Sequence, residues 1–262
     1  MCLLVAAFDA HPDYRLVLVG HRDEFHARPA GPLGWWPDQP GILAGRDLEA
    51  GGTWLGVGRD GRVAVVTNVR GRDALVPGAP TRGALVPDFL ASGLPAAGHA
   101  SALTTGAAAY SGFNLLTYDG ASLAYVTNRP SSEAQALAAG VYGLSNARLD
   151  SPWPKVELAR RRVAGVLTTG RVTPESLFAA INDRQPAADT QLPDTGVGLE
   201  LERLLSAPFI VSPEYGTRCT TLVLAGRDGG IRVEERRYSP SGETTGRTVV
   251  AFHTSRTGFA DG

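Results

Sequence analysis

Cys2, Arg22 and Asp23 are the residues whose types and spacing best suit catalysis in this sequence. A thiol reacts as its thiolate, and a neighbouring guanidinium favours that form. If Met1 is removed, Cys2 also carries a free α-amine, whose ordinary pKa of about 8 suits a general base for the thiol. In this interpretation Arg22 favours the thiolate and Asp23 holds the amine. Together the three residues indicate nucleophilic attack on a carbonyl group.

Two apolar runs, 3–8 and 14–20, must position these residues. The intervening His11-Pro12-Asp13 is typical of a turn, so the runs are expected to pair as a hairpin. That pairing brings Cys2, at the start of one strand, beside Arg22 at the end of the other. Neighbouring residues of a straight strand face opposite ways, so we expect a deformation near Gly20 if Arg22 and Asp23 both approach the thiol.

Strand-end asparagines are candidates for an oxyanion hole. Two later hairpins contain Asp-Gly turns and end in Thr-Asn, at Asn68 and Asn128, and a third strand ends at Asn146. An asparagine amide can stabilise an oxyanion, but asparagine also caps turns without any catalytic role, and both readings stay open here. Arg218 begins a late strand and can reach the same centre. Its neighbour Cys219 should face the other way and is interpreted as a structural thiol.

The order of elements predicts an α+β fold with antiparallel sheets. Strands occur in hairpins before and after a central helical region, and helices are expected at 84–90, 96–109, 151–167 and 173–181. Residues 26–47 are rich in proline and glycine, and we expect an ordered irregular loop in which Trp35 and Trp36 cover part of the core. The whole range 1–262 is expected to form one domain.

Composition excludes several classes of protein. The 262 residues are 43% hydrophobic and carry a formal net charge of −1, which gives no electrostatic basis for binding nucleic acid. We expect no transmembrane segment, no secretory signal and a cytoplasmic location. The two cysteines are then expected to be reduced thiols. The five histidines show no metal-ligand spacing, so no metal is expected, and the sequence does not indicate the oligomeric state.

A set of motifs spread along the chain resembles the NRDE family, which includes the transport and Golgi organisation protein 2 homologues. The matching stretches are Met1-Cys2, Arg22-Asp23-Glu24-Phe25 with Arg28-Pro29, 51–56, Thr67-Asn68, 112–115, 142–146, 151–155 and 215–218. One position departs from the family pattern: the motif that names the family begins with asparagine, and this chain has His21 there.

The resemblance implies an N-terminal nucleophile hydrolase-like αββα sandwich, two antiparallel sheets flanked by helices, similar to the cysteine branch of those hydrolases. Carried over position by position, it implies a catalytic set consisting of Cys2, Arg22, Asp23, Asn68, Asn128 and Arg218. Asn146 matches the family pattern without an assured counterpart in the acylases of that branch. The spacing of Asp23 after Arg22 is tighter than in those acylases.

Two functions follow from the resemblance. The first is an amidohydrolase that cleaves a small non-peptide amide through an acyl-enzyme and requires no cofactor. The alternative is a non-catalytic protein that binds and traffics haem or an acyl-coenzyme A or lipid ligand in the same cleft. Its ligand-binding residues would be Trp35, Trp36, Trp54, Tyr142 and Asn146, with a histidine or Cys2 as an iron ligand. An interaction protein without a ligand is the least favoured hypothesis, because it leaves the polar strand ends unexplained.

Overall fold

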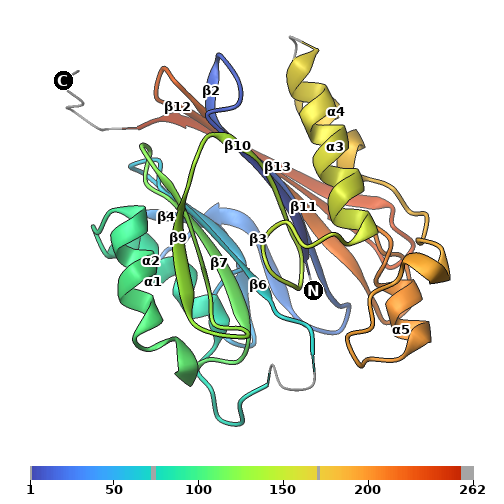
Figure 1. Cartoon of the computed structure of the whole chain (residues 1–262). Helices are drawn as coiled ribbons and strands as arrows, with labels where there is room; N and C mark the ends of the chain where they lie inside the picture. The colour runs from blue at the N-terminus through green and yellow to red at the C-terminus, as the bar shows by residue number, and fades with distance from the viewer. Residues whose placement is uncertain (1, 72–74, 170–171, 255–262) are drawn as a thin grey trace.

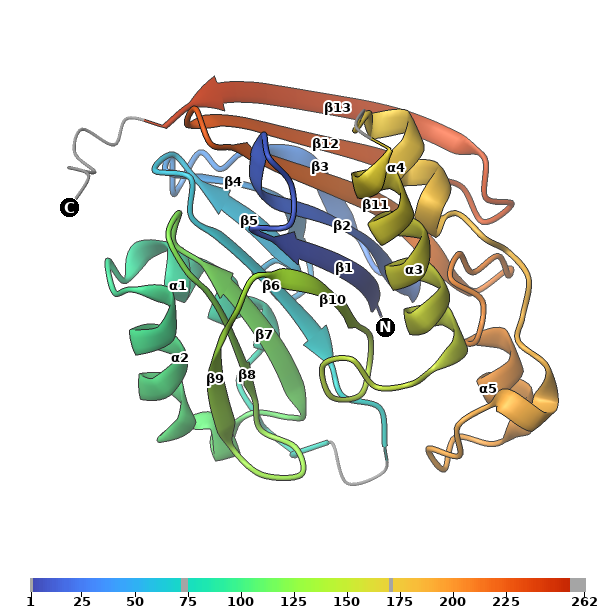
Figure 2. The same ribbon diagram turned by 45° about the horizontal axis from the view of Figure 1, so that its top comes forward.

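The computed structural model describes residues 2–71, 75–169 and 172–254. Two antiparallel sheets pack face to face, and helices lie on both outer faces (Figures 1 and 2). The predicted αββα sandwich of antiparallel sheets is therefore confirmed.

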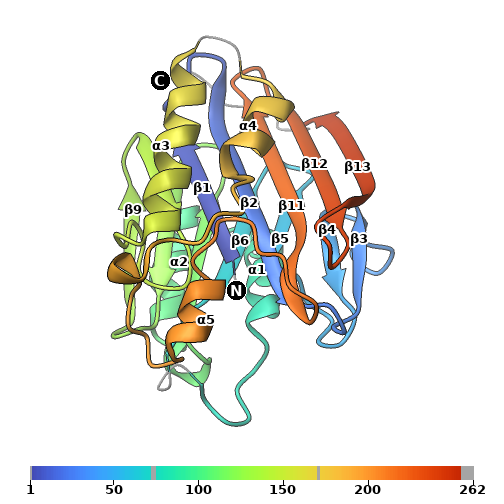
Figure 3. The same cartoon turned by 90° about the vertical axis from the view of Figure 1, so that its right-hand side faces the viewer.

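The first sheet has six strands in the order β10-β1-β2-β11-β12-β13. Their bounds are β1 Cys2–Phe8, β2 Tyr14–Phe25, β10 Gly140–Leu144, β11 Tyr215–Gly226, β12 Gly230–Tyr238 and β13 Thr244–His253. The predicted first hairpin is present, and its register is unbroken from Cys2 opposite Arg22 to Phe8 opposite Leu16. In Figure 3, β13 lies at the outer edge of this sheet.

The second sheet has seven strands in sequence order, from β3 to β9. Their bounds are β3 Ala30–Trp35, β4 Ile42–Asp47, β5 Leu55–Gly58, β6 Val63–Asn68, β7 Phe113–Tyr118, β8 Leu123–Thr127 and β9 Glu133–Leu137. The two predicted Asp-Gly hairpins are β5–β6 and β7–β8.

Alternating apolar residues build the core between the sheets. Leu4 and Leu18 of the first sheet are almost fully buried in one cluster with Leu55 and Leu116 of the second. Burying a leucine side chain contributes about 1.5–3 kcal/mol, so this layer is a main source of stability. The opposite residues of β1 and β2 point outward to the helices, which makes the first sheet apolar on both faces.

Two pairs of helices cover the outer faces. Helices α3 (Pro154–Thr168) and α4 (Pro174–Ile181) pack on β10, β1, β2 and β11, whereas α1 (Leu85–Ala91) and α2 (Ala96–Thr104) cover the second sheet. Short helices η2 (Arg82–Ala84), η3 (Ala107–Ala109), η4 (Asp189–Gln191) and α5 (Leu199–Leu204) lie in the connections. The predicted cap of α4 is present, since the Thr173 side chain accepts a hydrogen bond from the Ser176 backbone.

Two expectations about local structure are wrong. Residues 26–47 are not an irregular loop, because they contain β3 and β4; β3 is the edge strand of its sheet, where proline and a register shift between Gly31 and Gly34 are tolerated. The deformation expected near Gly20 is also absent. The irregularity lies on the neighbouring strand instead, between Thr217 and Cys219 of β11.

No helix in the described ranges 2–71, 75–169 and 172–254 is both long enough and apolar enough to cross a membrane.

Candidate functional site

The register of the first hairpin places the Cys2 thiol beside the Arg22 guanidinium. Cys2 pairs directly with Arg22, so both side chains lie on the same face of the sheet, and that face looks toward the second sheet. Arg22 is buried and Cys2 is half-buried. Asp23 alternates to the other face of β2, and its backbone N–H favours the thiolate of Cys2.

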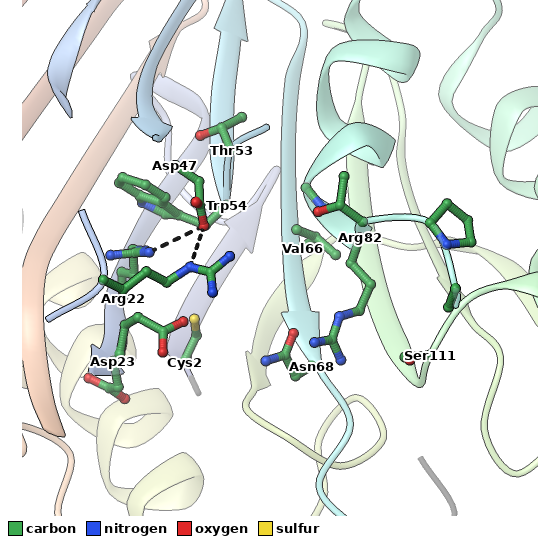
Figure 4. A pocket seen from close by; sticks show the side chains of 16 residues that line it. Cys2, Arg22, Asp23, Asp47, Thr53, Trp54, Val66, Asn68, Arg82 and Ser111 are labelled. Atoms are coloured by element: carbon green, nitrogen blue, oxygen red, sulfur yellow. Dashed lines mark hydrogen bonds and ion pairs between the residues drawn. The ribbon is translucent and has the colours of Figure 1, made fainter. Parts of the chain in front are cut away.

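A cavity of about 270 Å³ opens at this end of the sandwich, between the two sheets. Figure 4 shows Cys2, Arg22 and Asp23 on one wall and Asn68 and Arg82 on the opposite wall. The other lining residues are Glu24, Arg28, Asp47, Thr53, Trp54, Val66, Ala79, Pro80, Thr81, Gly83 and Ser111. The lining is dominated by charged and polar groups, which suits a small polar ligand.

Arg22 is held in place from two sides. Its guanidinium carbon lies 4.4 Å above the ring centroid of Trp54, and its Nη2 lies 3.6 Å from Asp47 Oδ2. Nη1 is buried and has no hydrogen-bond partner among the residues that the structure describes. Buried donors are normally paired, so this nitrogen is a donor available to a ligand.

Asp47 is committed mainly to Arg28, whose Nε donates to Asp47 Oδ2 at 2.7 Å. Burial alone would raise the pKa of Asp47, but the hydrogen bonds from Arg28 and from backbone N–H groups bring it below its ordinary value. The ionised Asp47 thus anchors two arginines, and Arg22 has only the longer of the two contacts.

Two glycines bring the opposite wall into position. A Cβ on Gly52 would lie 2.5 Å from the backbone of Gly83, so only glycine allows this approach. The Thr53 N–H donates to the Gly83 carbonyl at 3.1 Å, which fixes η2 against the start of β5. Arg82 is thereby directed into the cavity, where burial lowers its pKa.

The thiol of Cys2 is protonated in this environment at neutral pH. Burial raises its pKa and the charge of Asp23 acts in the same direction, while the Asp23 backbone N–H and the Arg22 guanidinium act against them. The net shift is upward, so a base is needed to generate the thiolate.

Asp23 belongs to a buried polar cluster behind the thiol. Its Oδ1 accepts a hydrogen bond from Thr217 Oγ1 at 2.7 Å, and its backbone carbonyl accepts one from the Tyr215 hydroxyl at 3.0 Å. Lys155, in the first turn of α3, is also buried and interacts electrostatically with Asp23 and Cys2.

The structure does not bring every predicted residue to the cavity. Arg218 occupies the irregular position of β11 and donates through Nη1 to the carbonyls of Phe25 and Arg28, so it fixes the chain after β2. The Asn128 amide bonds to backbone groups of Phe113, Ala107 and Tyr110, inside its own part of the second sheet.

Asn146 takes part in the site only indirectly. Its Nδ2 donates to the backbone carbonyl of Asn68 at 2.8 Å, and its Oδ1 accepts from Ser145. Asn68 itself lines the cavity. Of the three predicted oxyanion donors, Asn68 lines the cavity that Cys2 also lines. Asn146 hydrogen-bonds to the backbone of Asn68 from behind, and the Asn128 amide lies apart from the cavity.

Only one of the four predicted aromatic wall residues lines the cavity, and it is Trp54. Trp35 packs edge-on against Phe252, and Trp36 is buried with its Nε1 directed at the Ala44 carbonyl. The Tyr142 hydroxyl donates to Ala138. Paired tryptophans indicated a cover over the core, and burial of Trp36 fits that interpretation.

The histidines lie elsewhere. His21, at the position that departs from the family motif, faces α4: its ring nitrogens contact Thr220 Oγ1 at 2.8 Å and the Ile181 carbonyl at 3.0 Å. No histidine lines the main cavity among the described residues. Within those residues, no group of three or more His, Cys, Asp or Glu side chains is arranged to hold a metal ion. Haem binding stays a prediction.

Sequence reasoning assigned no role to four charged residues that the structure places at or behind the cavity, which are Arg28, Asp47, Arg82 and Lys155. Two of them, Arg28 and Lys155, fall inside stretches that resemble the family. No local sequence pattern marks Arg82 and Asp47 as site residues. They lie near the thiol only because η2 packs against the segment that joins β4 and β5.

A solved structure, the Caenorhabditis elegans N-acylethanolamine-hydrolyzing acid amidase (NAAA) ortholog, aligns with 85% of this chain and 92% of its own at a TM-score of 0.49 and 9% identity.

Sequence relatives are closer. The Transport and Golgi organization protein 2 homolog of Bos taurus is 34% identical over 270 residues, covering 95% of this chain and 98% of the bovine protein. The Homo sapiens homolog is 33% identical and covers 90% of this chain and 92% of its own. The sequence profile of the Transport and Golgi organisation 2 family matches residues 1–240. The chain therefore belongs to the Transport and Golgi organisation 2 family.

Proposed function

We propose that this protein is an N-terminal cysteine amidohydrolase, which cleaves a small amide through an acyl-enzyme after Met1 has been removed. The observation that carries the proposal is the pairing of Cys2 with Arg22 at the wall of a cavity whose far side presents Asn68. A nucleophile, a cation and an amide donor thus surround one space large enough for a small substrate.

In the first half of the reaction, the Cys2 sulfur attacks the amide carbonyl carbon and forms a carbon–sulfur bond. The α-amine of Cys2 takes the thiol proton and passes it to the leaving nitrogen as the carbon–nitrogen bond breaks. The oxyanion is stabilised by the Asn68 amide and by Nη1 of Arg22, the buried donor without a partner among the described residues.

In the second half, water attacks the thioester. The α-amine accepts a proton from the water, the carbon–sulfur bond breaks, and the departing Cys2 thiolate takes that proton back from the α-ammonium. The products are a carboxylic acid and an amine, and the enzyme returns to its starting state. Because burial keeps the thiol protonated, turnover depends on this amine, which does not exist while Met1 is attached.

The space next to Cys2 indicates a short acyl group. An apolar crevice of about 10 Å³ continues from Cys2 past Gly20, Trp54 and Val65. This volume accommodates about one water-sized group, so a long acyl chain cannot enter without movement of the sheets. The polar main cavity then receives the leaving group.

The test uses N-acetyl, N-butyryl and N-phenylacetyl p-nitroanilides as probes, with release of p-nitroaniline as the measurement. We expect the acetyl compound to be cleaved fastest and Cys2→Ala to abolish cleavage. Cys219→Ala is the matched control, because this second thiol is buried outside the cavity and its loss should leave the rate unchanged. Equal hydrolysis by Cys2→Ala and the parent protein would refute the proposal.

A further inference from the structure

Lys155 is the only lysine in the sequence. The other twenty-four basic residues counted with it are arginines. Arginine is the basic residue on the surface and in the ion pairs of this chain. Position 155 is the single position that has lysine instead. Lysine differs from arginine in carrying a compact charge that can lose its proton in a buried setting.

The position of Lys155 works against stability. The side chain is buried, with 2% of the residue exposed, and its Nζ has no hydrogen-bond partner among the residues that the structure describes. It follows Pro154 in the first turn of α3, where the helix dipole disfavours a cation. Buried charges are normally paired, and cations are disfavoured at a helix N-terminus. Lys155 departs from both rules, and such exceptions are expected at functional sites.

The surroundings of Lys155 combine charged and polar groups from several elements. Asp23 and His21 come from β2, Cys2 from β1, Arg70 from the segment after β6, and Glu202 from α5. Figures 1 and 3 show the beginning of β1 beside the N-terminal end of α3.

Two of these charges are already paired with each other. Arg70 Nη1 donates to Glu202 Oε2 at 2.6 Å, and both side chains are almost fully buried. The Arg70 guanidinium also lies 4.6 Å from the ring centroid of Trp153, the N-cap residue of α3. Asp23, Cys2 and Glu202 are the acidic groups that act on Lys155, and of these Glu202 is also paired with Arg70.

We propose that Lys155 is a positioning residue of the Cys2 site, whose buried ammonium attracts the carboxylate of Asp23 without a direct hydrogen bond and stabilises the thiolate that forms on Cys2. The inference rests on the proposed function in assigning Cys2 as the nucleophile. This role would add the helical layer of the fold to the site, because Lys155 lies on α3 and acts on the thiol electrostatically, whereas Cys2 and Arg22 lie on the first sheet.

The electrostatics of Lys155 agree with this role. Burial lowers its pKa to about 8, while Asp23 and Cys2 hold it up. The ammonium form therefore still predominates at neutral pH. Because electrostatic coupling between two sites is reciprocal, a cation that is favoured by Cys2 must in turn favour ionisation of Cys2.

The first experiment measures the rate of Cys2 alkylation by iodoacetamide against pH, with the modified peptide quantified by mass spectrometry. In Lys155→Met the rate at pH 7.5, where Lys155 of the parent protein is still mainly in its ammonium form, should fall about tenfold, so that the acid limb of the profile moves to higher pH by about one unit. Arg161→Met is the matched control, because it removes an exposed charge from the same helix and should leave the profile unchanged.

The alkylation profile separates this inference from the hydrolase proposal, because labelling a thiol requires neither loss of Met1 nor turnover. A shifted profile in a protein that cleaves no amide contradicts only the hydrolase. An unshifted profile in a folded Lys155→Met variant, with a thermal midpoint like that of the parent, contradicts the role of Lys155 even if amides are cleaved.

The second experiment does not depend on the folding of a Lys155 variant. Protein labelled with [13Cε]lysine gives a single lysine resonance by NMR, and its titration reports Lys155 directly. Asp23→Asn should lower the pKa of Lys155 by about one unit relative to the parent protein, because the opposing carboxylate is lost. An unchanged lysine titration in Asp23→Asn would overturn the inference.

Discussion

Asn68 and Asn128 follow threonine at the ends of two similar hairpin strands, yet the structure gives their amides different surroundings. Asn68 lines the cavity opposite Cys2, whereas the Asn128 amide is buried and bonds to four backbone groups of its own sheet and the adjoining turn. The same sequence pattern therefore occurs at one candidate catalytic amide and at one structural amide.

Substitution by alanine should separate the two roles. Asn128→Ala leaves buried backbone groups unpaired and should destabilise the protein by about 2–4 kcal/mol in urea unfolding. Asn68→Ala should change stability by less than about 0.5 kcal/mol but lower p-nitroanilide cleavage by about 10²–10³-fold. Full activity in Asn68→Ala, or loss of activity without loss of stability in Asn128→Ala, would reverse the assignment.

At the residue scale, the sequence supports predictions that depend on strand alternation. The pairing of Cys2 with Arg22 follows from the lengths of two apolar runs and a turn, and it is confirmed. Whether a strand-end amide turns toward a cavity or back into its own loop depends on neighbours distant in sequence. The catalytic roles of these residues stay predictions.

Among the secondary-structure elements, β12 and β13 extend beyond the helices that cover the first sheet. Glu234 of β12 points to that outer face and is fully buried beneath three arginines. It accepts hydrogen bonds from Arg232, Arg236 and Arg247, the last through both carboxylate oxygens. Burial alone would raise the pKa of Glu234, but these arginines lower it to about 2.

This network predicts a specific acid sensitivity. Because the pKa of Glu234 is lower in the folded state, its contribution is complete above the ordinary value near 4.5 and is lost as the pH falls toward 2. Glu234→Gln should be less stable than the parent by about 2 kcal/mol at pH 7, after allowance for screening at the partly exposed arginines. The difference should have fallen to about a quarter near pH 2.5 and should vanish only below pH 2. Unfolding curves that stay equally separated at both pH values would exclude this contribution.

The wrong expectation for residues 26–47 also belongs at this scale. Glycine and proline usually mark loops, but β3 is an edge strand whose free edge needs no continuous ladder of hydrogen bonds. Helices with a clear apolar stripe, such as α3, were predictable within about three residues. Edge strands depend on the sheet beside them, which the local sequence does not describe.

On the scale of the whole molecule, the site lies where three layers meet at one end of the sandwich. The first sheet supplies Cys2 and Arg22, the second sheet and its η2 connection supply Asn68 and Arg82, and the helical layer supplies Lys155. The αββα architecture was predictable from the resemblance to a family, but the convergence of these layers comes from long-range packing. In particular, the approach of Gly83 to Gly52 has no signature in either segment alone.

The central claim is that Cys2, freed of Met1, forms an acyl-enzyme. The most direct test is the mass of the intact protein, acid-quenched during turnover of N-acetyl p-nitroanilide, followed by peptide mapping. We predict a chain lighter by one methionine residue and heavier by one acetyl group, with the acetyl group on Cys2. A chain that turns over the probe while retaining Met1, or that carries the acetyl group on another residue, would contradict this account.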